Sequence, residues 1–371
     1  MVVSAESAGE RRAMTSALRP RGSRRRLTVV LSVLGGGWLA GVASADERPA
    51  ISLRGHRGAV RQLVFHPNSK WLVSAGYEDP TRIWNLETRK IERTLSPRGR
   101  TVEGAASVIV RRQVECLAFA PGGEVLGEVA SDATLKGVIE LWKVPTGEPL
   151  RTLAEGQRNV RALAISSDGR LVASNVVDPD RFAHSIIVRD FQTGQTLATL
   201  AADQLSVTLL AFTPDGGWLV SAGGKKIHIW EMPSGKLLHA IPAHDKNIES
   251  IAIAPDGKTL ASGSEDALIK LWNLDDGKMI REIKSEQDAV HAVTLSPSGR
   301  TLASGGKDGT TRLWSPASGK QRGTLWAHVD RVLCAAFSPD GKWLATGSRD
   351  GTISVWKFEE PAEEKDEKKD K

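Results

Sequence analysis

Three stretches near the end of the chain repeat one pattern: LASGSEDALIKLW at residues 260–272, LASGGKDGTTRLW at 302–314 and LATGSRDGTISVW at 344–356. Their closing tryptophans lie 42 residues apart, and Trp230 continues the series one step toward the N-terminus. Each stretch holds two apolar runs of strand length, separated by a polar turn that contains Asp. Repetition at a fixed period predicts a fold built from one supersecondary unit used many times.

Further upstream the unit varies in length but can still be counted. The apolar residue that opens each unit, Val332 in the last one, lies before the tryptophan position by 24, 28, 29, 23, 24, 24 and 24 residues in chain order. In the third unit Arg189 takes the place of the tryptophan. The chain therefore has seven units, and the second and third carry insertions.

Within a unit, apolar runs and hairpin turns predict four short strands. In the seventh unit RVLCAAF, WLATGS and TISVWKF read as strands, and SPDGK and RDG read as the turns between them. Four strands in about 42 residues are typical of a β-propeller blade, whereas the coils of a parallel β-solenoid are shorter and lack hairpins. We therefore predict an all-β, seven-bladed propeller with four-stranded blades over residues 46–358.

The two ends of the repeat array predict how the ring closes. The array opens with a lone strand from Ile51 and ends on the third strand of the seventh unit. The N-terminal strand is therefore expected to join the last blade as its fourth strand, which removes two exposed sheet edges. Residues 359–371 carry seven acids and four lysines, and we expect them to form a disordered, charged tail.

The repeats resemble those of the WD40 family over about residues 51–358. The resemblance rests on Gly55-His56, Ala243-His244 and Ala327-His328, which precede the first strand, and on the three stretches that close the unit. It implies the propeller fold, with ligands bound on the face formed by the loops before the first strand and between the second and third strands. The sequence departs from the family where Asp should follow the tryptophan, and carries these residues instead: Asn85, Lys143, Glu231, Asn273, Ser315 and Lys357.

His, Ser or Thr, Asp and Trp recur together at fixed spacing. A Ser–His–Asp set resembles a protease triad, but the family resemblance implies a structural network, and a buried indole N–H and a buried carboxylate both need partners. The expected network residues are His56, Ser74, Trp84, His244, Ser262, Asp266, Trp272, Ser304, Asp308, Trp314, His328, Thr346, Asp350 and Trp356. The second, third and fourth units lack the histidine. Two further units depart from the pattern, because Asp79 comes one place late and Glu286 occupies a histidine place.

The remaining polar residues favour a binding protein over an enzyme. The other histidines are scattered, and neither a metal-ligand spacing nor a haem-attachment motif nor a glycine-rich phosphate loop occurs after the N-terminal segment. We therefore expect no catalytic residue, no cofactor and no metal. The alternative is an enzyme that uses the central channel, as some other propeller families do.

The family resemblance points to a rim of side chains that flank each opening residue or precede a turn Asp. These are Arg61, Glu115, Arg161, Thr208, Glu249, Glu265, His291, Lys307, Leu333 and Arg349. Their charges are mixed and their apolar content is low, which favours a protein or peptide partner. Three alternatives remain: an ordinary solvated rim, the opposite face, or the insertions at residues 97–112 and 175–185.

The N-terminal segment reads as an export signal. Basic residues 19–26 precede an uncharged stretch at 27–41 and then Ala43-Ser44-Ala45, which predicts a signal peptide over residues 1–45, cleaved before Asp46. We expect a bacterial-type exported protein, periplasmic or secreted. Left open are an uncleaved anchor, which would make the chain an accessory subunit of an envelope complex, a twin-arginine signal, and a start at Met14.

Charge and cysteine content exclude two further classes. The net charge of +6 falls to +4 once the +5 of residues 1–45 and the −3 of the last thirteen residues are set aside, so the propeller lacks the basic footprint of a nucleic-acid-binding protein. Cys116 and Cys334 lie in the second and seventh units, so we expect two separate buried thiols. We also expect a monomer that contacts no membrane beyond the N-terminal segment.

Overall fold

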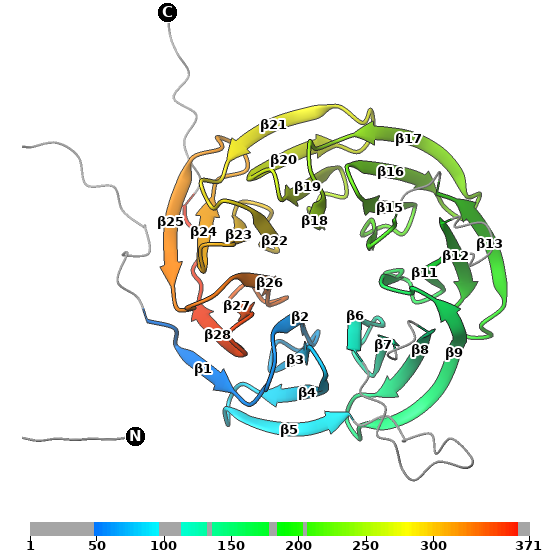
Figure 1. The fold of residues 1–371 in the computed structure, drawn as a ribbon, viewed down its shortest axis with the longest axis horizontal. Helices are drawn as coiled ribbons and strands as arrows, with labels where there is room; N and C mark the ends of the chain where they lie inside the picture. Colours follow the sequence, from blue (N-terminus) through cyan, green and yellow to red (C-terminus); the bar gives the residue numbers. More distant parts are fainter. Residues whose placement is uncertain (1–47, 96–112, 132–135, 178–183, 203–205, 363–371) are drawn as a thin grey trace, which may run out of the picture. The chain divides into compact units, whose positions relative to one another are not determined.

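The described part of the computed structural model comprises residues 48–95, 113–131, 136–177, 184–202 and 206–362. Within these ranges the chain forms 28 β-strands and no helix. The strands make seven blades around a central opening (Figure 1), which confirms the predicted all-β, seven-bladed propeller. The described residues therefore offer no helix of the length and hydropathy needed to span a membrane.

Each blade has four antiparallel strands, and its innermost strand faces the central opening (Figure 1). The strands of blades one to three are β2 (Val60–Phe65), β3 (Trp71–Gly76), β4 (Asp79–Asn85), β5 (Lys90–Leu95), β6 (Gln113–Phe119), β7 (Val125–Ser131), β8 (Lys136–Lys143), β9 (Glu148–Arg158), β10 (Leu163–Ile165), β11 (Leu171–Val177), β12 (His184–Asp190) and β13 (Thr196–Ala201). The strands of blades four to seven are β14 (Leu209–Phe212), β15 (Trp218–Gly223), β16 (Lys226–Glu231), β17 (Lys236–Pro242), β18 (Ile248–Ile253), β19 (Thr259–Ser264), β20 (Leu268–Asn273), β21 (Met279–Lys284), β22 (Val290–Leu295), β23 (Leu302–Gly306), β24 (Thr310–Trp314), β25 (Gln321–Trp326), β26 (Val332–Phe337), β27 (Trp343–Ser348), β28 (Thr352–Lys357) and β1 (Ile51–Arg54).

The N-terminal strand closes the ring, as predicted. Strand β1 pairs antiparallel with β28, and Leu53 lies opposite Ile353. Its side chains alternate between buried and exposed, so that Ile51 and Leu53 enter the core while Ser52 faces solvent. One strand from the start of the array therefore completes the blade at its end.

Blades two and three are joined by strand pairing. Strand β9 is 11 residues long, whereas the equivalent strands β5, β21 and β25 have six residues and β17 has seven. Its last residue, Arg158, lies opposite Val177 of β11 in the next blade. The two blades thereby form one continuous sheet, a feature that the sequence analysis did not predict.

The hydrophobic core lies between adjacent blades. A cluster between blades four and five, for example, joins Val220 and Ile229 to Leu260 and Trp272. The tryptophan that closes the third strand is buried in each of six blades, as Trp84, Trp142, Trp230, Trp272, Trp314 and Trp356. Burial of a large apolar side chain contributes about 1.5–3 kcal/mol, so the repeated indole is a principal reason why blades stack.

Cys116 and Cys334 are both free, which confirms the predicted separate thiols. Burial raises the pKa of Cys116 to about 11 and also raises the pKa of Cys334, so both stay protonated at neutral pH.

The last described residues lie against the propeller. Phe358 packs edge-on against Phe337, with ring centroids 4.8 Å apart. The Thr301 hydroxyl donates a hydrogen bond of 2.7 Å to Glu360. The predicted tail therefore does not leave the ring directly at residue 359. Residues 363–371 of that tail, like the predicted signal peptide, lie outside the described residues.

Candidate functional site

Blade five contains the full polar network. The Trp272 indole N–H donates to Ser262 Oγ at 2.9 Å, and Ser262 Oγ lies 2.7 Å from His244 Nε2. On the other side of the ring, His244 Nδ1 lies 2.9 Å from Asp266. A neutral imidazole satisfies this chain, because its Nε2 accepts from the hydroxyl and its Nδ1–H donates to the carboxylate.

Blade one also has the complete network, although Asp79 comes one place late in the sequence. Asp79 Oδ2 lies 2.9 Å from His56 Nδ1, and His56 Nε2 lies 2.6 Å from Ser74 Oγ. Glu78, the residue before Asp79, has a positive φ of 51°. Arg82 Nη1 lies 2.6 Å from Asp79 Oδ2. The extra residue is thus accommodated in the turn, and Asp79 belongs to the network although its sequence position departs from the pattern by one.

Blade six corrects the expectation for Glu286. The Glu286 side chain is exposed, and the histidine place is filled by Gln287, which is fully buried. Gln287 Oε1 accepts from the Ser304 hydroxyl at 2.6 Å, and its amide donates to Thr310 Oγ1 at 3.2 Å. Asp308 in turn accepts from Thr310 Oγ1. An amide one residue later therefore replaces the imidazole, a substitution that histidine spacing could not reveal.

Blade seven links its aspartate less directly. His328 Nε2 lies 2.8 Å from Thr346 Oγ1, and Trp356 Nε1 donates to the same hydroxyl at 3.4 Å. His328 Nδ1 lies 3.0 Å from Thr352 Oγ1 but 3.6 Å from Asp350. Asp350 accepts from Thr352 Oγ1 at 2.6 Å, so the threonine hydroxyl lies between the imidazole and the carboxylate.

Blades two to four lack the histidine and differ from one another. In blade four the Trp230 indole donates to Ser221 Oγ at 2.9 Å. In blade three Arg189, buried in the tryptophan place, donates to Ser174 Oγ at 3.0 Å, and burial lowers its pKa. In blade two the hydroxyl place holds the buried Glu128, which accepts from Thr81 of blade one at 2.8 Å.

These contacts make the networks structural rather than catalytic. Ser74 and Ser262 are completely buried, so neither hydroxyl can reach a substrate. The hydroxyl is also engaged by the indole N–H, which a catalytic serine would have to lose. Among the described residues, no group of three or more His, Cys, Asp or Glu side chains is arranged to hold a metal ion.

The buried histidines make stability depend on pH. Burial lowers the pKa of His56 to about 4, helped by Arg82 and opposed by Asp79, and burial likewise lowers the pKa of His244 and His328. The unfolded chain therefore takes up these protons near pH 6.5, before the folded chain does. The stabilising contribution is complete above pH 6.5 and is lost as the pH falls toward 4.

We predict that the free energy of unfolding decreases between pH 6.5 and 4, and that His56→Gln reduces the slope by about 1.4 kcal/mol per pH unit, the value for one proton. Gln287 of blade six, one residue after the histidine place, shows that an amide can accept from the serine hydroxyl of such a network. Urea denaturation at several pH values measures the slope, and identical slopes for the variant and the wild type would contradict the assignment.

The predicted binding face is organised by a repeated β-bulge. Near the start of the innermost strand, the pairing of β2, β6, β18, β22 and β26 with the next strand skips one residue. The skipped residues are Arg61, Glu115, Glu249, His291 and Leu333. A bulge re-aims the side chain of the extra residue, so these five predicted positions share one structural role. Arg161 and Thr208 lie just before the short strands β10 and β14.

The second predicted set lies beside the first. Glu265, Lys307 and Arg349 stand in the turns between the second and third strands, and their backbone N–H groups donate to Asn247, Ala289 and Arg331. Each acceptor immediately precedes the residue that opens the innermost strand. The two sets therefore meet at one end of the blades, which we call the turn face.

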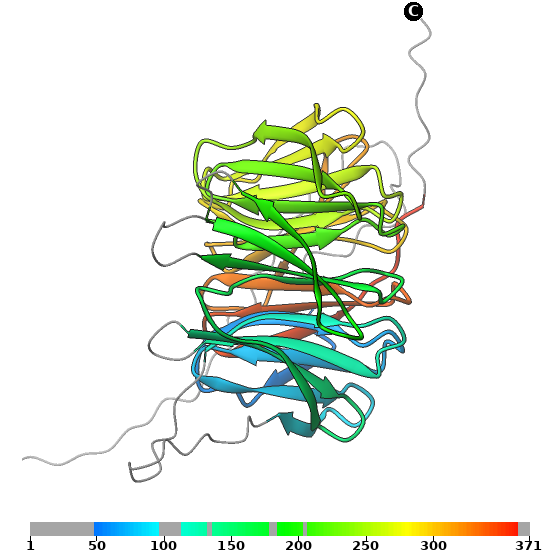
Figure 2. The same ribbon diagram turned by 90° about the vertical axis from the view of Figure 1, so that its right-hand side faces the viewer.

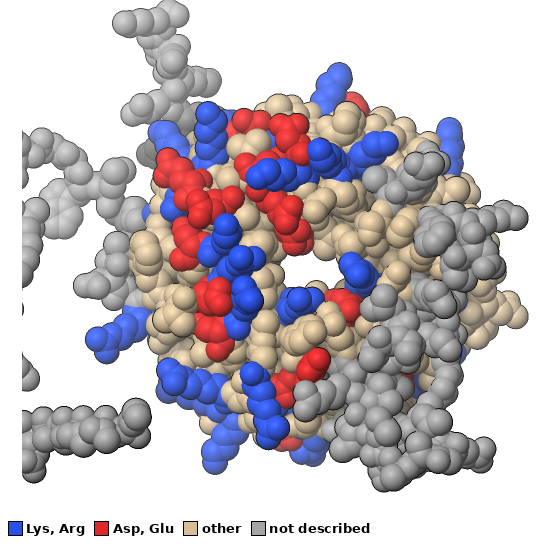
Figure 3. All heavy atoms as spheres, in the orientation of Figure 1, with Lys and Arg blue, Asp and Glu red and all other residues tan. Residues whose placement is uncertain are grey.

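Figure 3 shows the turn face with acidic side chains gathered over blades five and six, and basic side chains beside them between blades six and one. Across the blade five–six boundary, Glu249 lies 3.9 Å from His291. Glu115 accepts from the Ser131 hydroxyl at 3.2 Å. The Arg349 Nε lies 3.9 Å from Asp330, with both side chains more than two-fifths exposed, so this pair is weak.

Sequence reasoning missed one member of the turn face. Tyr77 occupies the turn position of blade one, where its backbone N–H donates to Ala59. The Arg61 guanidinium lies 5.2 Å from the centre of the Tyr77 ring, a cation–π contact. Its place directly after Gly76, equivalent to Glu265 after Ser264, was the signal that could have identified it.

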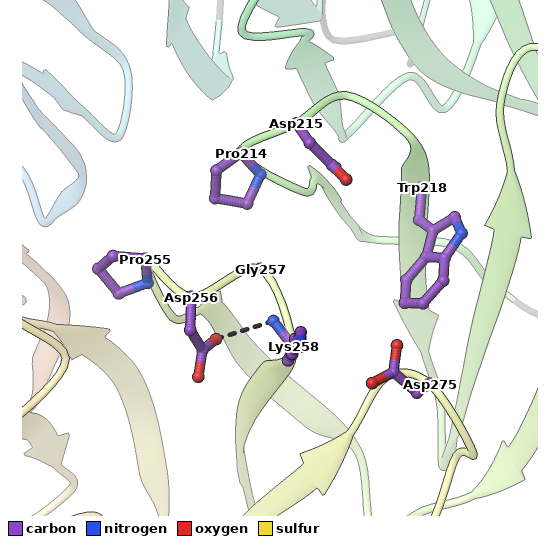
Figure 4. Close-up of a pocket in the computed structure, with 8 residues that line it drawn as sticks. All are labelled: Pro214, Asp215, Trp218, Pro255, Asp256, Gly257, Lys258 and Asp275. Atoms are coloured by element: carbon purple, nitrogen blue, oxygen red, sulfur yellow. Dashed lines mark hydrogen bonds between the residues drawn. The ribbon is translucent and has the colours of Figure 1, made fainter.

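A shallow cavity of about 310 Å³ lies at the opposite end of blades four and five. Figure 4 shows Trp218 and Lys258 facing it together with the carboxylates of Asp215, Asp256 and Asp275. Asp215 and Asp256 are engaged by their own hairpins, through Gly217 N–H and Lys258 N–H, and these bonds help to lower their pKa values. Two of the three carboxylates therefore have a turn-forming role.

Comparison with known proteins adds a family and several relatives. The family described as "IFT122 first beta-propeller" matches residues 206–371, and "WD domain, G-beta repeat" matches residues 47–85. Similar proteins include nuclear distribution protein PAC1-1 of Uncinocarpus reesii, 28% identical over 59% of this chain and 44% of that protein. Another is nuclear distribution protein PAC1 of Coccidioides posadasii, 25% identical over 59% of this chain and 58% of that protein.

The human apoptotic protease-activating factor 1 is also similar, with 31% identity over 32% of this chain and 9% of that protein. The chain thus spans about half or less of the length of two of these relatives and somewhat more of the third. All three are eukaryotic proteins, so they do not support the bacterial-type, exported character that the N-terminal segment led us to expect.

Proposed function

We propose that the chain, a β-propeller similar to WD-repeat proteins, is a non-enzymatic scaffold whose turn face binds a protein segment. The observation that carries the proposal is the repeated bulge, which places one side chain from each of five blades at the same end of the ring as the turn residues. The similarity to WD-repeat proteins, one of which is named a protease-activating factor, supports a role in contacts with other proteins.

The charge distribution supports a directional mode of binding. Lys307, Arg349 and Arg61 stand on three consecutive blades, and Glu249 and Glu265 stand together on blade five. A segment with one acidic and one basic end fits this face in one direction, because reversal would bring like charges together.

We predict that the combined variant Arg61→Glu, Lys307→Glu and Arg349→Glu loses its partner while its melting temperature stays within error of the wild type. These rim charges act mainly on association rate and salt dependence, so three reversals are needed for a clear effect. The measurement is capture of chemically cross-linked partners from cell extract, followed by binding to the purified partner. Lys143→Glu, Lys236→Glu and Lys320→Glu, three exposed cations at the opposite end of the blades, are the matched control because they change the net charge equally.

Retention of the partner by the triple variant would contradict this placement. Loss through changes at Asp275 or Trp218 would instead locate the site at the opposite face, where those two residues line the cavity. The insertion at residues 97–112 and most of that at 175–185 lie outside the described residues, and their deletion tests the remaining alternative.

Export is a second, separate proposal that rests on the sequence alone. We propose a cleaved signal peptide and a periplasmic or secreted protein, with the membrane-anchored envelope subunit as the alternative. Intact-mass measurement of the protein from its native host is expected to give a chain that begins at Asp46. A chain that keeps residues 27–41 would favour the anchored alternative.

A further inference from the structure

Two apolar side chains stand in water at the edge of the turn face. Val329 is 92% exposed and Trp326 is 65% exposed, the two highest values among the large hydrophobic residues described. Both belong to the end of β25 and the short connection to β26, between blades six and seven. The two residues are three positions apart in the chain, and an apolar patch exposed in one place can mark a protein contact surface.

The fold does not require an apolar residue at either place. The backbone N–H of Val329 donates to Asp350, as those of Arg57 and Asp245 donate to Asp79 and Asp266 in blades one and five. The same loop conformation is thus formed by Val, Arg and Asp.

The fold also does not require an apolar residue at the position of Trp326. Trp326 pairs with the first residue of the third strand of its blade, Thr310, and the equivalent partners in blades five and seven are Lys284 and Arg54. Both of these residues are exposed. Neither apolar side chain therefore has a structural role that the other blades share.

Cations flank the loop on both sides. A Cβ atom on Gly309, which has a φ of +80°, would lie 3.0 Å from the His328 carbonyl oxygen, so the blade six turn that carries Lys307 touches the Val329 loop. On the other side, the Arg349 backbone N–H donates to Arg331 at 2.9 Å. The exposed Lys307 and Arg349 side chains thus stand on the two turns that adjoin the loop.

We propose that Trp326 and Val329 are the apolar anchor for a protein segment in which an aromatic or aliphatic side chain is flanked by carboxylates. The proposal rests on the function proposed above and names the partner chemistry. Trp is among the residues that contribute most at protein interfaces, and Lys307 and Arg349 complement acidic neighbours of the bound apolar residue. The nearby Asp308 lies 3.5 Å from Arg312, which leaves the lysine beside it to face a ligand. Asp330 of the loop lies 3.9 Å from Arg349 in a weak, exposed pair that a ligand carboxylate can replace.

The test uses the full chain and a phage-displayed library of random twelve-residue peptides. The protein carries either its own residues or the double change Trp326→Lys and Val329→Asp. These replacements copy Lys284 and Asp245 from the equivalent places of blade five, so the fold is expected to tolerate them. Ile280→Lys, at an exposed apolar residue of the outer strand β21, is the matched control.

We expect the wild type and the Ile280→Lys control to enrich peptides that combine an aromatic or aliphatic residue with acidic neighbours. Affinity of the best peptide, measured by fluorescence anisotropy, should fall at least tenfold in the double variant, with an unchanged melting temperature. Binding of that peptide should also protect Trp326 from quenching by iodide.

Three results would overturn the inference: enrichment of no acidic–apolar peptide, equal affinity for the double variant, or a dimer in light scattering that the double variant abolishes. The last result would make a second copy of the chain the occupant. The proposed function is tested separately. If the cross-linked partner is lost by the triple charge reversal but kept by the double variant, the turn face binds it without this anchor. If both variants keep the partner, both proposals fail.

Discussion

Replacing Leu53 by alanine is expected to lower the free energy of unfolding by about 2–5 kcal/mol, the range for truncation of a buried leucine. Leu53 is almost completely buried, in a cluster that includes Ile353 and Val355 of β28 and Val60 and Leu63 of blade one. The strand that carries it is paired on one side only, with β28. Loss of this contact therefore weakens the step that closes the ring, in addition to leaving a cavity.

Urea denaturation at pH 7 measures the loss, and Ser52→Ala is the matched control. Ser52 belongs to the same strand and faces solvent, so its change should stay within about 0.5 kcal/mol. If Leu53→Ala and Ser52→Ala unfold at equal urea concentrations, closure of the ring by β1 does not limit the stability of the propeller.

The repeated elements could be predicted from the sequence because each of them has the same local structural role in many units. The Trp positions, the hairpin turns and the unpaired strand at Ile51 fix seven blades and their closure, and the structure contains both. The joining of blades two and three could not be predicted, because it depends on how far β9 extends within an insertion of irregular length.

The networks could be predicted in type but not in every position. Spacing alone placed Asp79 outside its network and Glu286 inside one, whereas the turns shift by one residue through positive φ angles at Glu78 and Glu286. A one-residue shift in a turn moves a side chain across the loop without altering the flanking strands. Spacing rules therefore hold along strands and fail at their connections.

The turn face could likewise be predicted only in part from the sequence. Its bulge residues follow from their place next to the buried opening residue of each inner strand, which the sequence displays. Exposure does not follow from the sequence, because the apolar character of Val329 and Trp326 does not show whether either side chain is covered by the neighbouring blades. Only the three-dimensional loop shows that both side chains point into solvent.

The Asp266→Ala variant is expected to have a free energy of unfolding about 3 kcal/mol lower, at the upper end of the range for a buried donor that loses its acceptor. Asp266 is the acceptor for His244 Nδ1 at 2.9 Å, and it also accepts the backbone N–H groups of Asp245 and Leu268. His244 is fully enclosed and has no second acceptor at Nδ1 among the contacts of the described residues. Loss of the Asp266 carboxylate therefore leaves the buried Nδ1–H group of His244 without an acceptor, the most costly outcome for a polar group.

The equivalent change in blade seven is expected to cost less. The sequence alone would suggest that Asp350→Ala isolates His328, but Thr352 Oγ1 lies 3.0 Å from His328 Nδ1 and stays in place. We therefore expect a loss of about 1–3 kcal/mol for Asp350→Ala. Asp266→Asn separates charge from hydrogen bonding, because an amide oxygen can still accept from His244, and its loss should be smaller than that of Asp266→Ala. Thermal and urea denaturation of the three variants rank them, and equal losses for the two alanine variants would show that the direct imidazole–carboxylate contact adds nothing to the stability of a blade.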